Sequence, residues 1–401
     1  MKYSSIIEKI DQLGLCLGCG LCESVCGRQA VEMKLGNDGF IHPEIKMDVA
    51  GNEAVIEKIC PGLNIVNDIG FSDKESVWGH IEKLWSGYSK DNNARRKGSS
   101  GGIISGLAIY ALDKGIVDGV LQVGGDSEDY ERNCLKVSYT REEVLACASS
   151  RYAPAYIFNR IFDILNQDQK RYLFVGKPCD VSALKNFLNA FPQYKLRFNL
   201  TVSIICAGMP SLKGTSAIID EFEAVRPVKD LVYRGNGWPG YFSFKDDSGT
   251  VYKKTYNDSW GKTLNKHLKL RCKLCPDGIG IQADIAVGDA WETNDGYPDF
   301  SEKDGQSLII ARTAGGVAIL KQAQADATVC LEKLGIEKIR LMQPYQYNRR
   351  TKIGARVFAF YLSKRVRLNF KNMHVYKNGR LVKFASLIKE FLGTYKRLNK
   401  F

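Results

Sequence analysis

The sequence predicts an α/β core domain that is preceded by a small α+β domain. Two observations support this prediction. Beyond residue 98, short apolar strands alternate with helical stretches, which is the pattern of an α/β sheet. Before residue 75, closely spaced cysteines are followed by short strand and helix patterns. We therefore expect a first domain at 1–75, a core domain at 76–344 and a basic tail at 345–401.

The composition is that of a soluble protein. The chain has 401 residues, enough for two or three domains, and 44% of them are hydrophobic and 25% charged. No segment approaches the roughly 18 apolar residues of a membrane span, and the N-terminus lacks the apolar core of a secretory signal. The 12 cysteines are too sparse for a disulfide scaffold, so the sequence predicts a reducing, cytoplasmic location.

The first domain contains the run Cys16-Leu-Gly-Cys19-Gly-Leu-Cys22, with Cys26 just beyond it. This spacing is typical of the loop around a cubane 4Fe–4S cluster, in which each iron takes one thiolate. The two intervening glycines permit the sharp turns that such a loop needs. A zinc knuckle would instead pair one Cys-x-x-Cys with a distant second pair. The run therefore predicts a ferredoxin-like domain with a 4Fe–4S cluster.

The fourth ligand of this cluster has two candidates. A strand is expected at 29–33, an edge segment at 40–44 and a helix at 52–59, which leads to Cys60. In two-cluster ferredoxins the last cysteine of each run binds the other cluster, and a proline usually follows it. Cys60 is followed by proline and Cys26 by glycine, which favours Cys60, while the assignment to Cys26 stays open.

The core domain begins with a small-residue loop, Gly98-Ser-Ser-Gly-Gly102, before an apolar helical stretch at 103–112. A strand is expected next, at 116–123. A small-residue loop that opens a helix presents unpaired N–H groups, and these can bind a phosphate. On its own this pattern is weak, because it also occurs in ordinary turns.

Three further strands are expected at 171–176, 199–205 and 283–288, and a helix at 181–190 follows the first of them. Ligands of α/β sheets collect beyond the carboxyl ends of the strands. Two single cysteines follow the first two of these strands, and a Cys-x-x-Cys pair precedes the third. The candidate ligands of a second cluster are Cys179, Cys206, Cys272 and Cys275. The alternative is that the single cysteines are buried core residues and the pair is half of a zinc site.

Several motifs occur in an order that is typical of a known protein family. The motifs are Gly98-Ser-Ser-Gly-Gly102, Val117-Asp-Gly-Val120, Ser150-Arg-Tyr-Ala-Pro154, Gly176-Lys-Pro-Cys179, Cys206-Ala-Gly, Tyr233-Arg-Gly-Asn-Gly-Trp-Pro-Gly240, Cys272-Lys-Leu-Cys275, Ala283-Asp-Ile-Ala-Val-Gly-Asp289 and Gly305-Gln-Ser307. From residue 98 onward the sequence resembles the beta subunit family of coenzyme F420 hydrogenases and dehydrogenases. The resemblance implies a flavin and iron–sulfur core domain, with one ferredoxin-type cysteine run where many relatives have two.

The resemblance implies a noncovalent FAD and a 4Fe–4S cluster held by the second set of cysteines, which makes two 4Fe–4S clusters in the whole chain. It also implies residues of the FAD site, namely Ser99, Ser100, Gly101, Gly102, Arg151, Tyr152 and Lys177. Positive charge near the flavin N1 favours the anionic reduced form, a role expected for Lys177 and Arg151. We expect Asp289 and Trp291 to shape an acceptor pocket, under a mobile lid at 233–240.

The function expected from these features is that of an oxidoreductase. A flavin accepts a hydride and releases electrons singly, and iron–sulfur clusters carry single electrons. The organic acceptor is expected to be the deazaflavin coenzyme F420 or a glycan-pathway substrate, because bacterial members of the family include some encoded with surface-polysaccharide genes. The alternative is an electron-transfer subunit that serves an electron donor or acceptor protein and has no substrate of its own. A scaffold that has lost its chemistry is the third interpretation.

The positive charge of the chain lies in its tail. The whole chain has a net charge of +13, whereas residues 345–401 contain 15 Lys/Arg and one acid, Glu390. An amphipathic helix is expected at 384–395. The tail is interpreted as a solvated helical extension or as an attachment to an anionic membrane surface at the inner face of the membrane. Nucleic-acid binding is disfavoured, because no nucleic-acid motif accompanies the charge.

Overall fold

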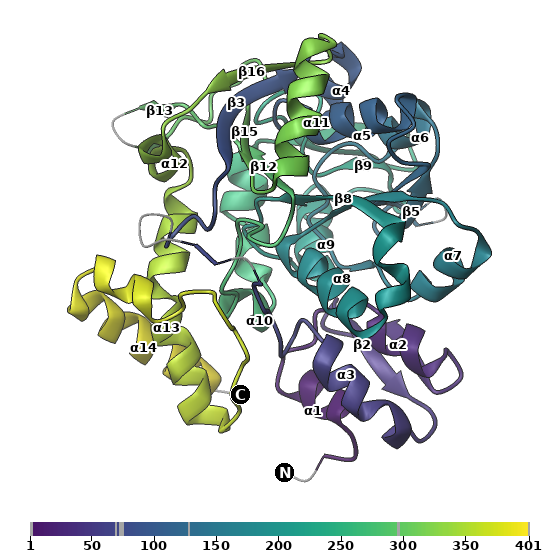
Figure 1. Ribbon diagram of the computed structural model, residues 1–401. Helices are drawn as coiled ribbons and strands as arrows, with labels where there is room; N and C mark the ends of the chain where they lie inside the picture. Colours follow the sequence, from purple (N-terminus) through teal and green to yellow (C-terminus); the bar gives the residue numbers. More distant parts are fainter. Residues whose placement is uncertain (1–2, 69, 72–75, 127–128, 295–296, 400–401) are drawn as a thin grey trace.

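The structure is a computed structural model that describes residues 3–68, 70–71, 76–126, 129–294 and 297–399. Its centre is a nine-stranded mixed sheet (Figure 1). The strand order is β16 (Val329–Lys333), β3 (Lys83–Ser89), β15 (Ser307–Ala311), β12 (Ile285–Asp289), β8 (Phe198–Ile204), β7 (Tyr172–Gly176), β4 (Gly119–Gly125), β5 (Asn133–Ser138) and β6 (Ala155–Tyr156). Strands β12, β8, β7 and β4 are parallel to one another, so their carboxyl ends share one edge.

Helices cover both faces of this sheet. On β7, Leu173 packs with α5 (Ile103–Asp113), α6 (Arg141–Ala146) and α11 (Ala314–Ala325). Its neighbours in the strand, Tyr172 and Phe174, pack with α7 (Ile161–Gln167) and α8 (Pro178–Ala190). Successive side chains of a strand point to opposite faces, so the central strands are apolar on both sides. The mixed α/β class that the sequence predicts is confirmed.

The N-terminal region is a small α+β unit that packs against the core. It consists of α1 (Ile6–Gln12), α2 (Leu21–Cys26), the antiparallel pair β1 (Val31–Leu35) and β2 (Ile41–Ile45), η1 (Ala50–Asn52) and α3 (Glu53–Ile59). Leu21 and Ile59 belong to the same apolar cluster as α8. The Asn186 amide on α8 donates to the carbonyls of Ile59 (3.3 Å) and Asn64 (3.2 Å). In Figure 1 this unit lies directly beside α8.

The predicted strands and helices of the core lie close to their expected positions, with one informative difference. The sequence predicts that the helix after β7 begins at residue 181, but α8 begins at Pro178. Proline is well tolerated in the first turn of a helix because its missing N–H has no intrahelical partner there. The Asp180 carboxylate accepts from the Lys177 N–H at 2.9 Å and caps this turn. Cys179 therefore lies within the first turn of the helix.

The remaining elements of the core are short. They are α4 (Asn92–Lys97), η3 (Pro192–Arg197), α9 (Leu212–Asp220), the sheet of β9 (Lys229–Val232), β10 (Phe242–Lys245) and β11 (Val251–Lys254), η4 (Asn257–Gly261), η5 (Leu264–His267), α10 (Leu270–Lys273), and the pair β13 (Thr293–Asn294) and β14 (Tyr297–Pro298). Across the part of the chain that the structure describes, every helix is too short or too polar to cross a bilayer.

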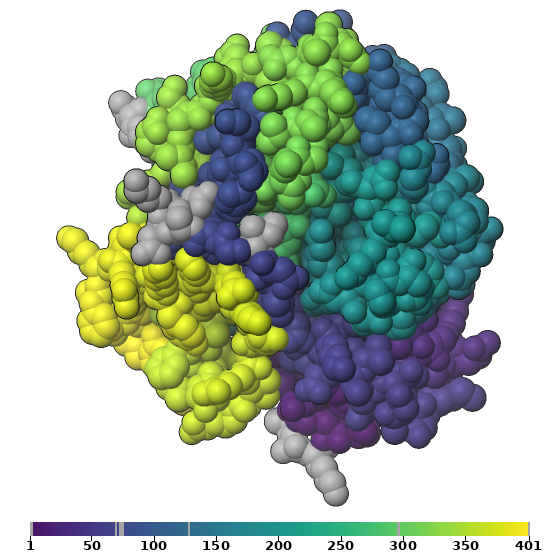
Figure 2. Space-filling view, in the orientation of Figure 1, coloured from purple at the N-terminus to yellow at the C-terminus, as the bar shows by residue number. Residues whose placement is uncertain are grey.

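The C-terminal segment is helical and is partly built into the core. It consists of α12 (Ile336–Met342), α13 (Pro344–Lys364), η6 (Lys377–Leu381) and α14 (Phe384–Leu398). Arg350 on α13 is fully buried, and its guanidinium donates to the carbonyls of Ser76, Val77 and Pro276. Figure 1 shows α14 on the outer side of α13, and Figure 2 shows the same segment at the periphery of the molecule. The last helix, α14, thus has a largely exposed face.

Candidate functional site

Four thiols of the N-terminal unit surround one small apolar cavity of about 30 Å³. They belong to Cys16, Cys19, Cys22 and Cys60. Cys26, at the end of α2, does not line this cavity and is only half-buried. The structure thus brings together three cysteines of the run and Cys60, and leaves Cys26 outside.

Backbone N–H groups point at these sulfurs. The Gly18 N–H donates to Cys16 Sγ at 3.3 Å, and the N–H groups of Gly62 and Leu63 act on Cys60 and favour its thiolate. Burial nevertheless raises the pKa of Cys16 to about 12, and it also raises the pKa of Cys60. The sulfurs of Cys16 and Cys60 are therefore buried, and backbone N–H groups point at them. Among the described residues, no group of three or more His, Cys, Asp or Glu side chains is arranged to hold a single metal ion.

The second set of cysteines comes from three elements at the carboxyl edge of the parallel strands. Cys179 lies in the first turn of α8, Cys206 follows β8, Cys272 lies in α10 and Cys275 follows it. Burial, together with the nearby Cys272 and Cys275, raises the pKa of Cys206 to about 12. Burial likewise raises the pKa of Cys179, with contributions from Asp180, Cys206 and Cys275. Thiols from three separate parts of the sequence thus lie close enough to affect one another's pKa.

Two side chains connect the two thiol groups. After burial, Asp180 is the largest cause that raises the pKa of Cys179, and it also raises the pKa of Cys19, though less than burial, Cys60 and Cys16 do. Arg271, next to Cys272, is buried, and its guanidinium donates to the carbonyls of Pro61 (2.9 Å) and Gly62 (2.8 Å), directly after Cys60. The thiol groups are therefore linked both through the first turn of α8 and through Arg271.

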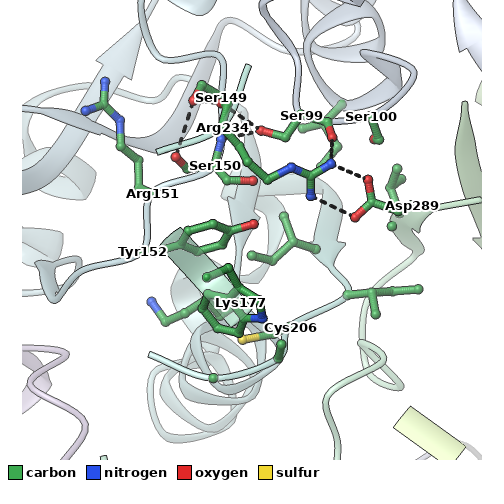
Figure 3. Close-up of a pocket in the computed structure, with 18 of the residues that line it drawn as sticks. Ser99, Ser100, Ser149, Ser150, Arg151, Tyr152, Lys177, Cys206, Arg234 and Asp289 are labelled. Carbon is green, nitrogen blue, oxygen red and sulfur yellow. Dashed lines mark hydrogen bonds and ion pairs between the residues drawn. The ribbon is translucent and has the colours of Figure 1, made fainter. Parts of the chain in front are cut away.

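A cavity of about 560 Å³ lies beside the second thiol group, and Cys206 is part of its wall. Its other walls come from the start of α5, the ends of β7 and β12, and the first turns of α13. Figure 3 shows Arg234 and Asp289 on one side of the cavity and Lys177 and Cys206 on the other. The volume is within the range of cofactor sites.

The loop before α5 forms the polar wall of this cavity. The Ser99 hydroxyl donates to the Arg234 carbonyl at 3.1 Å and accepts from the Ser150 N–H at 2.6 Å, and the Ser100 hydroxyl lies 2.9 Å from that of Ser307. Gly102 caps the helix at φ +70°, and a Cβ there would lie 2.4 Å from the Ala94 carbonyl oxygen. Only glycine suits this position. The first N–H groups of α5 have no intrahelical partners.

Gly101 differs from the other predicted residues of this loop. Its N–H donates to the Ser307 hydroxyl at 2.9 Å, and a Cβ there would lie 2.5 Å from the Gly87 carbonyl oxygen. Gly101 does not line the cavity. It brings the loop close to the sheet, whereas Ser99, Ser100 and Gly102 line the cavity itself.

A buried ion pair lies on the same side of the cavity as the loop before α5, and the Arg234 guanidinium also donates to the Ser99 carbonyl (Figure 3). The Arg234 guanidinium, only 2% exposed, pairs with both oxygens of Asp289 at 2.9 and 2.7 Å. The Trp238 indole N–H donates to the same carboxylate at 2.8 Å, and its ring stacks on Trp291 at 4.8 Å. The sequence suggests a mobile lid at 233–240. The ion pair instead fastens this loop to the end of β12.

The three remaining predicted residues of the cofactor site differ in position. Burial lowers the pKa of Lys177, but the Asp180 carboxylate, 2.7 Å from its Nζ, acts together with Cys179 and Cys206 and raises the pKa above its usual value. Lys177 is therefore a cation close to Cys206. Arg151 and Tyr152 both line the cavity, and Figure 3 shows the Arg151 guanidinium directed away from Lys177.

Several residues of the cavity wall were not predicted as site residues, and two of them contact the second thiol group. Gln346 and Arg349, in the first turns of α13, donate to the Cys206 carbonyl at 3.0 and 3.1 Å. In the sequence they belong to the basic tail, where Arg349-Arg350 reads only as charge. Arg271 was also missed, although it adjoins Cys272. No local pattern marks these contacts, because they depend on how α13 and α10 pack.

Comparisons with known proteins agree with this architecture. Residues 84–161 match the family described as coenzyme F420 hydrogenase/dehydrogenase, beta subunit N-term, and residues 169–336 match the corresponding C terminus. The chain is 27% identical over 254 residues to the coenzyme F420 hydrogenase subunit beta of Methanococcus voltae, covering 61% of this chain and 82% of that protein. It is 28% identical over 259 residues to the same subunit of Methanothermobacter thermautotrophicus, covering 62% and 83%.

A solved structure has the same fold. The structure of the F420-reducing NiFe hydrogenase complex from Methanosarcina barkeri contains a chain that matches with a TM-score of 0.53 and 21% identity, covering 71% of this chain and 94% of that one. The fold and the relatives define the class, which is that of proteins related to F420-dependent oxidoreductases. The chain belongs to the coenzyme F420 hydrogenase/dehydrogenase beta subunit family.

Proposed function

We propose that the chain is a flavin-dependent iron–sulfur oxidoreductase that passes electrons between two 4Fe–4S clusters, FAD and an organic acceptor. One observation supports the proposal, namely that the two thiol groups and the large cavity lie next to one another. The N-terminal thiols adjoin the second thiol group through Asp180 and Arg271, and the second group opens on the large cavity through Cys206. Carriers placed in this order form a route from the N-terminal unit to the cavity.

The first cluster would be held by Cys16, Cys19, Cys22 and Cys60. These four thiols share one cavity with backbone N–H donors, which suits the charge of an iron–sulfur cluster. The second cluster would be held by Cys179, Cys206, Cys272 and Cys275. Around that site the chain supplies Lys177, and the Met209 N–H, which donates to Cys272 Sγ at 3.4 Å. Positive charge and N–H donors at the sulfurs raise the reduction potential of a cluster.

The large cavity has the chemistry that an FAD needs. The wall includes the start of helix α5, whose free N–H groups suit a pyrophosphate. It also includes aromatic side chains, which suit a ring system. A flavin supplies the exchange between hydride and single-electron transfer when it is bound. The chain's part is to hold Lys177 charged on one side and the neutralised pair of Arg234 and Asp289 on the other, and to exclude water between them.

The proposed organic acceptor is coenzyme F420. This coenzyme appears in the names of the two relatives reported above. The cavity wall also carries Arg151 and Arg349, whose guanidinium groups donate to backbone carbonyls and keep a positive charge that suits an anionic ligand. A glycan-pathway substrate stays a prediction from the sequence. The 12 cysteines are all free thiols, and we infer that the protein works in a reducing, cytoplasmic compartment.

A second candidate function is favoured by the relatives. They are named as subunits, and the solved structure is titled a complex, so the chain is also a candidate electron-transfer subunit that serves a partner protein. The partner would then exchange electrons with the N-terminal thiol group, and the cavity would hold only the flavin.

Anaerobic purification followed by counts of iron, sulfide and flavin tests the proposal. We expect about eight irons, four for each cubane cluster, and one FAD in each chain. Zinc without flavin would contradict it. Reduction of coenzyme F420 by the isolated chain, with a one-electron dye as donor, supports the first function. A chain that binds both clusters and FAD but reduces F420 only with a co-purified partner supports the second.

A further inference from the structure

The outer face of α14 carries a row of exposed apolar side chains. Phe384, Ile388, Leu392 and Tyr395 follow one another at helical spacing, so they lie along one face. All four are exposed, Phe384 to 74% and Leu392 to 58%. Monomeric proteins rarely leave large contiguous apolar patches exposed unless the patch binds something.

A neighbouring face of α14 fixes its orientation, and the Phe391 ring joins the two faces because it also stacks on Tyr395 at 5.9 Å. Thr394 and Leu398 are buried, the Phe391 ring lies 5.8 Å from that of Phe358 on α13, and Glu390 pairs with Arg356 at 2.8 Å. The helix therefore cannot rotate its apolar row inward without breaking these contacts. The same pairing neutralises Glu390, the only acid of residues 345–401.

Basic side chains accompany the exposed row. Lys389 and Lys396 lie beside it on the helix, and both are exposed. Among the described residues, no acidic side chain forms an ion pair with either lysine. Further exposed basic residues lie at the two ends of the helix, namely Arg380, Lys383 and Arg397.

We propose that α14 binds an anionic lipid surface and lies in the plane of the interface. An apolar row flanked by lysines, on a helix with few acids, is the pattern of a helix that inserts its apolar side between lipid headgroups. Protein interfaces are instead depleted of lysine at their centre. The charge of the segment thus favours anionic lipid over a protein partner. Binding through α14 would hold the cavity and the two thiol groups at a membrane surface.

Flotation of the complete holoprotein with lipid vesicles tests this inference. We expect binding to phosphatidylcholine vesicles that contain about 30% phosphatidylglycerol, weaker binding to pure phosphatidylcholine, and loss of binding at high salt. Lys389→Gln and Lys396→Gln should each weaken binding by about fivefold. The double variant Phe384→Ser/Leu392→Ser should abolish it.

The matched control is Leu196→Ser, because Leu196 in η3 is 87% exposed and lies outside this segment. All variants should retain the wild-type melting temperature, iron and flavin, because the altered side chains are exposed. Equal binding to both vesicle types, or wild-type binding by the double variant, would overturn the proposal. So would a wild-type dimer in sedimentation that the double variant dissociates, since a second copy would then cover the face.

Discussion

The two thiol groups of this protein differ in how they are built and in what they adjoin. The first lies around a small apolar cavity of about 30 Å³, and three of its members are neighbours in the sequence. The second is assembled from separate elements and borders a cavity of about 560 Å³ with charged walls. A thiol group around so small a cavity leaves no room for an organic molecule, whereas a group beside a large cavity can deliver electrons to a bound molecule. We therefore expect the chemistry at the second group.

The largest expected effect comes from the member of the second group that borders the cavity. Cys206→Ser should lower the iron content from about eight to about four per chain, because one cubane cluster loses a ligand. Electron transfer from a reduced dye to the acceptor should fall to background, since the route then ends before the cavity. Anaerobic iron analysis and the F420 reduction assay measure both effects.

Cys134→Ser is the matched control, because Cys134 lies on β5 and belongs to neither thiol group. This variant should keep about eight irons and wild-type activity. Full activity in Cys206→Ser would show that the second group is not on the route.

The first group is tested by a pair of substitutions that differ only in position. Cys60→Ser should remove about four irons, because Cys60 lines the small cavity, whereas Cys26→Ser should retain all of them. Activity with an artificial dye should survive in Cys60→Ser if the dye can reach the second group directly. The reverse iron counts would assign the fourth ligand to Cys26.

The wall of the large cavity is tested through its buried ion pair. Asp289→Ala removes the carboxylate that neutralises Arg234, and loss of one partner of a buried pair costs about 3–5 kcal/mol. Thermal unfolding should therefore begin at a clearly lower temperature, and flavin should bind more weakly.

Glu44→Gln is the contrasting change in the N-terminal unit, since Glu44 pairs with Lys34 on the surface. We expect its melting temperature to match that of the wild type. Equal effects of the two substitutions would mean that the Arg234–Asp289 pair contributes no more than an exposed one.

The same contrast explains what the sequence can predict. The ligands of the first group are local, so the spacing of Cys16, Cys19 and Cys22 is visible without a fold. The strand ends that carry Cys179 and Cys206 follow from the alternation of strands and helices. The contacts of Arg271, Gln346 and Arg349 join segments up to about 210 residues apart, and no local pattern encodes which carbonyls they meet.

The smallest expected effect concerns a histidine contact between β2 and α1 of the N-terminal unit. His42 on β2 lies 2.6 Å from Asp11 and 3.0 Å from Asp38, and the hydrogen bond to Asp11 raises the pKa of His42 above 6.5, its ordinary value, despite partial burial and the nearby Lys269. A raised pKa in the folded state means that the stabilisation is complete below pH 6.5 and is lost as the pH rises through the folded-state pKa. The melting temperature of the holoprotein should therefore decrease slightly above pH 6.5, with a loss below about 1 kcal/mol because the pair is partly exposed. His42→Gln should remove this part of the pH dependence, and an unchanged slope would show that the contact does not stabilise the N-terminal unit.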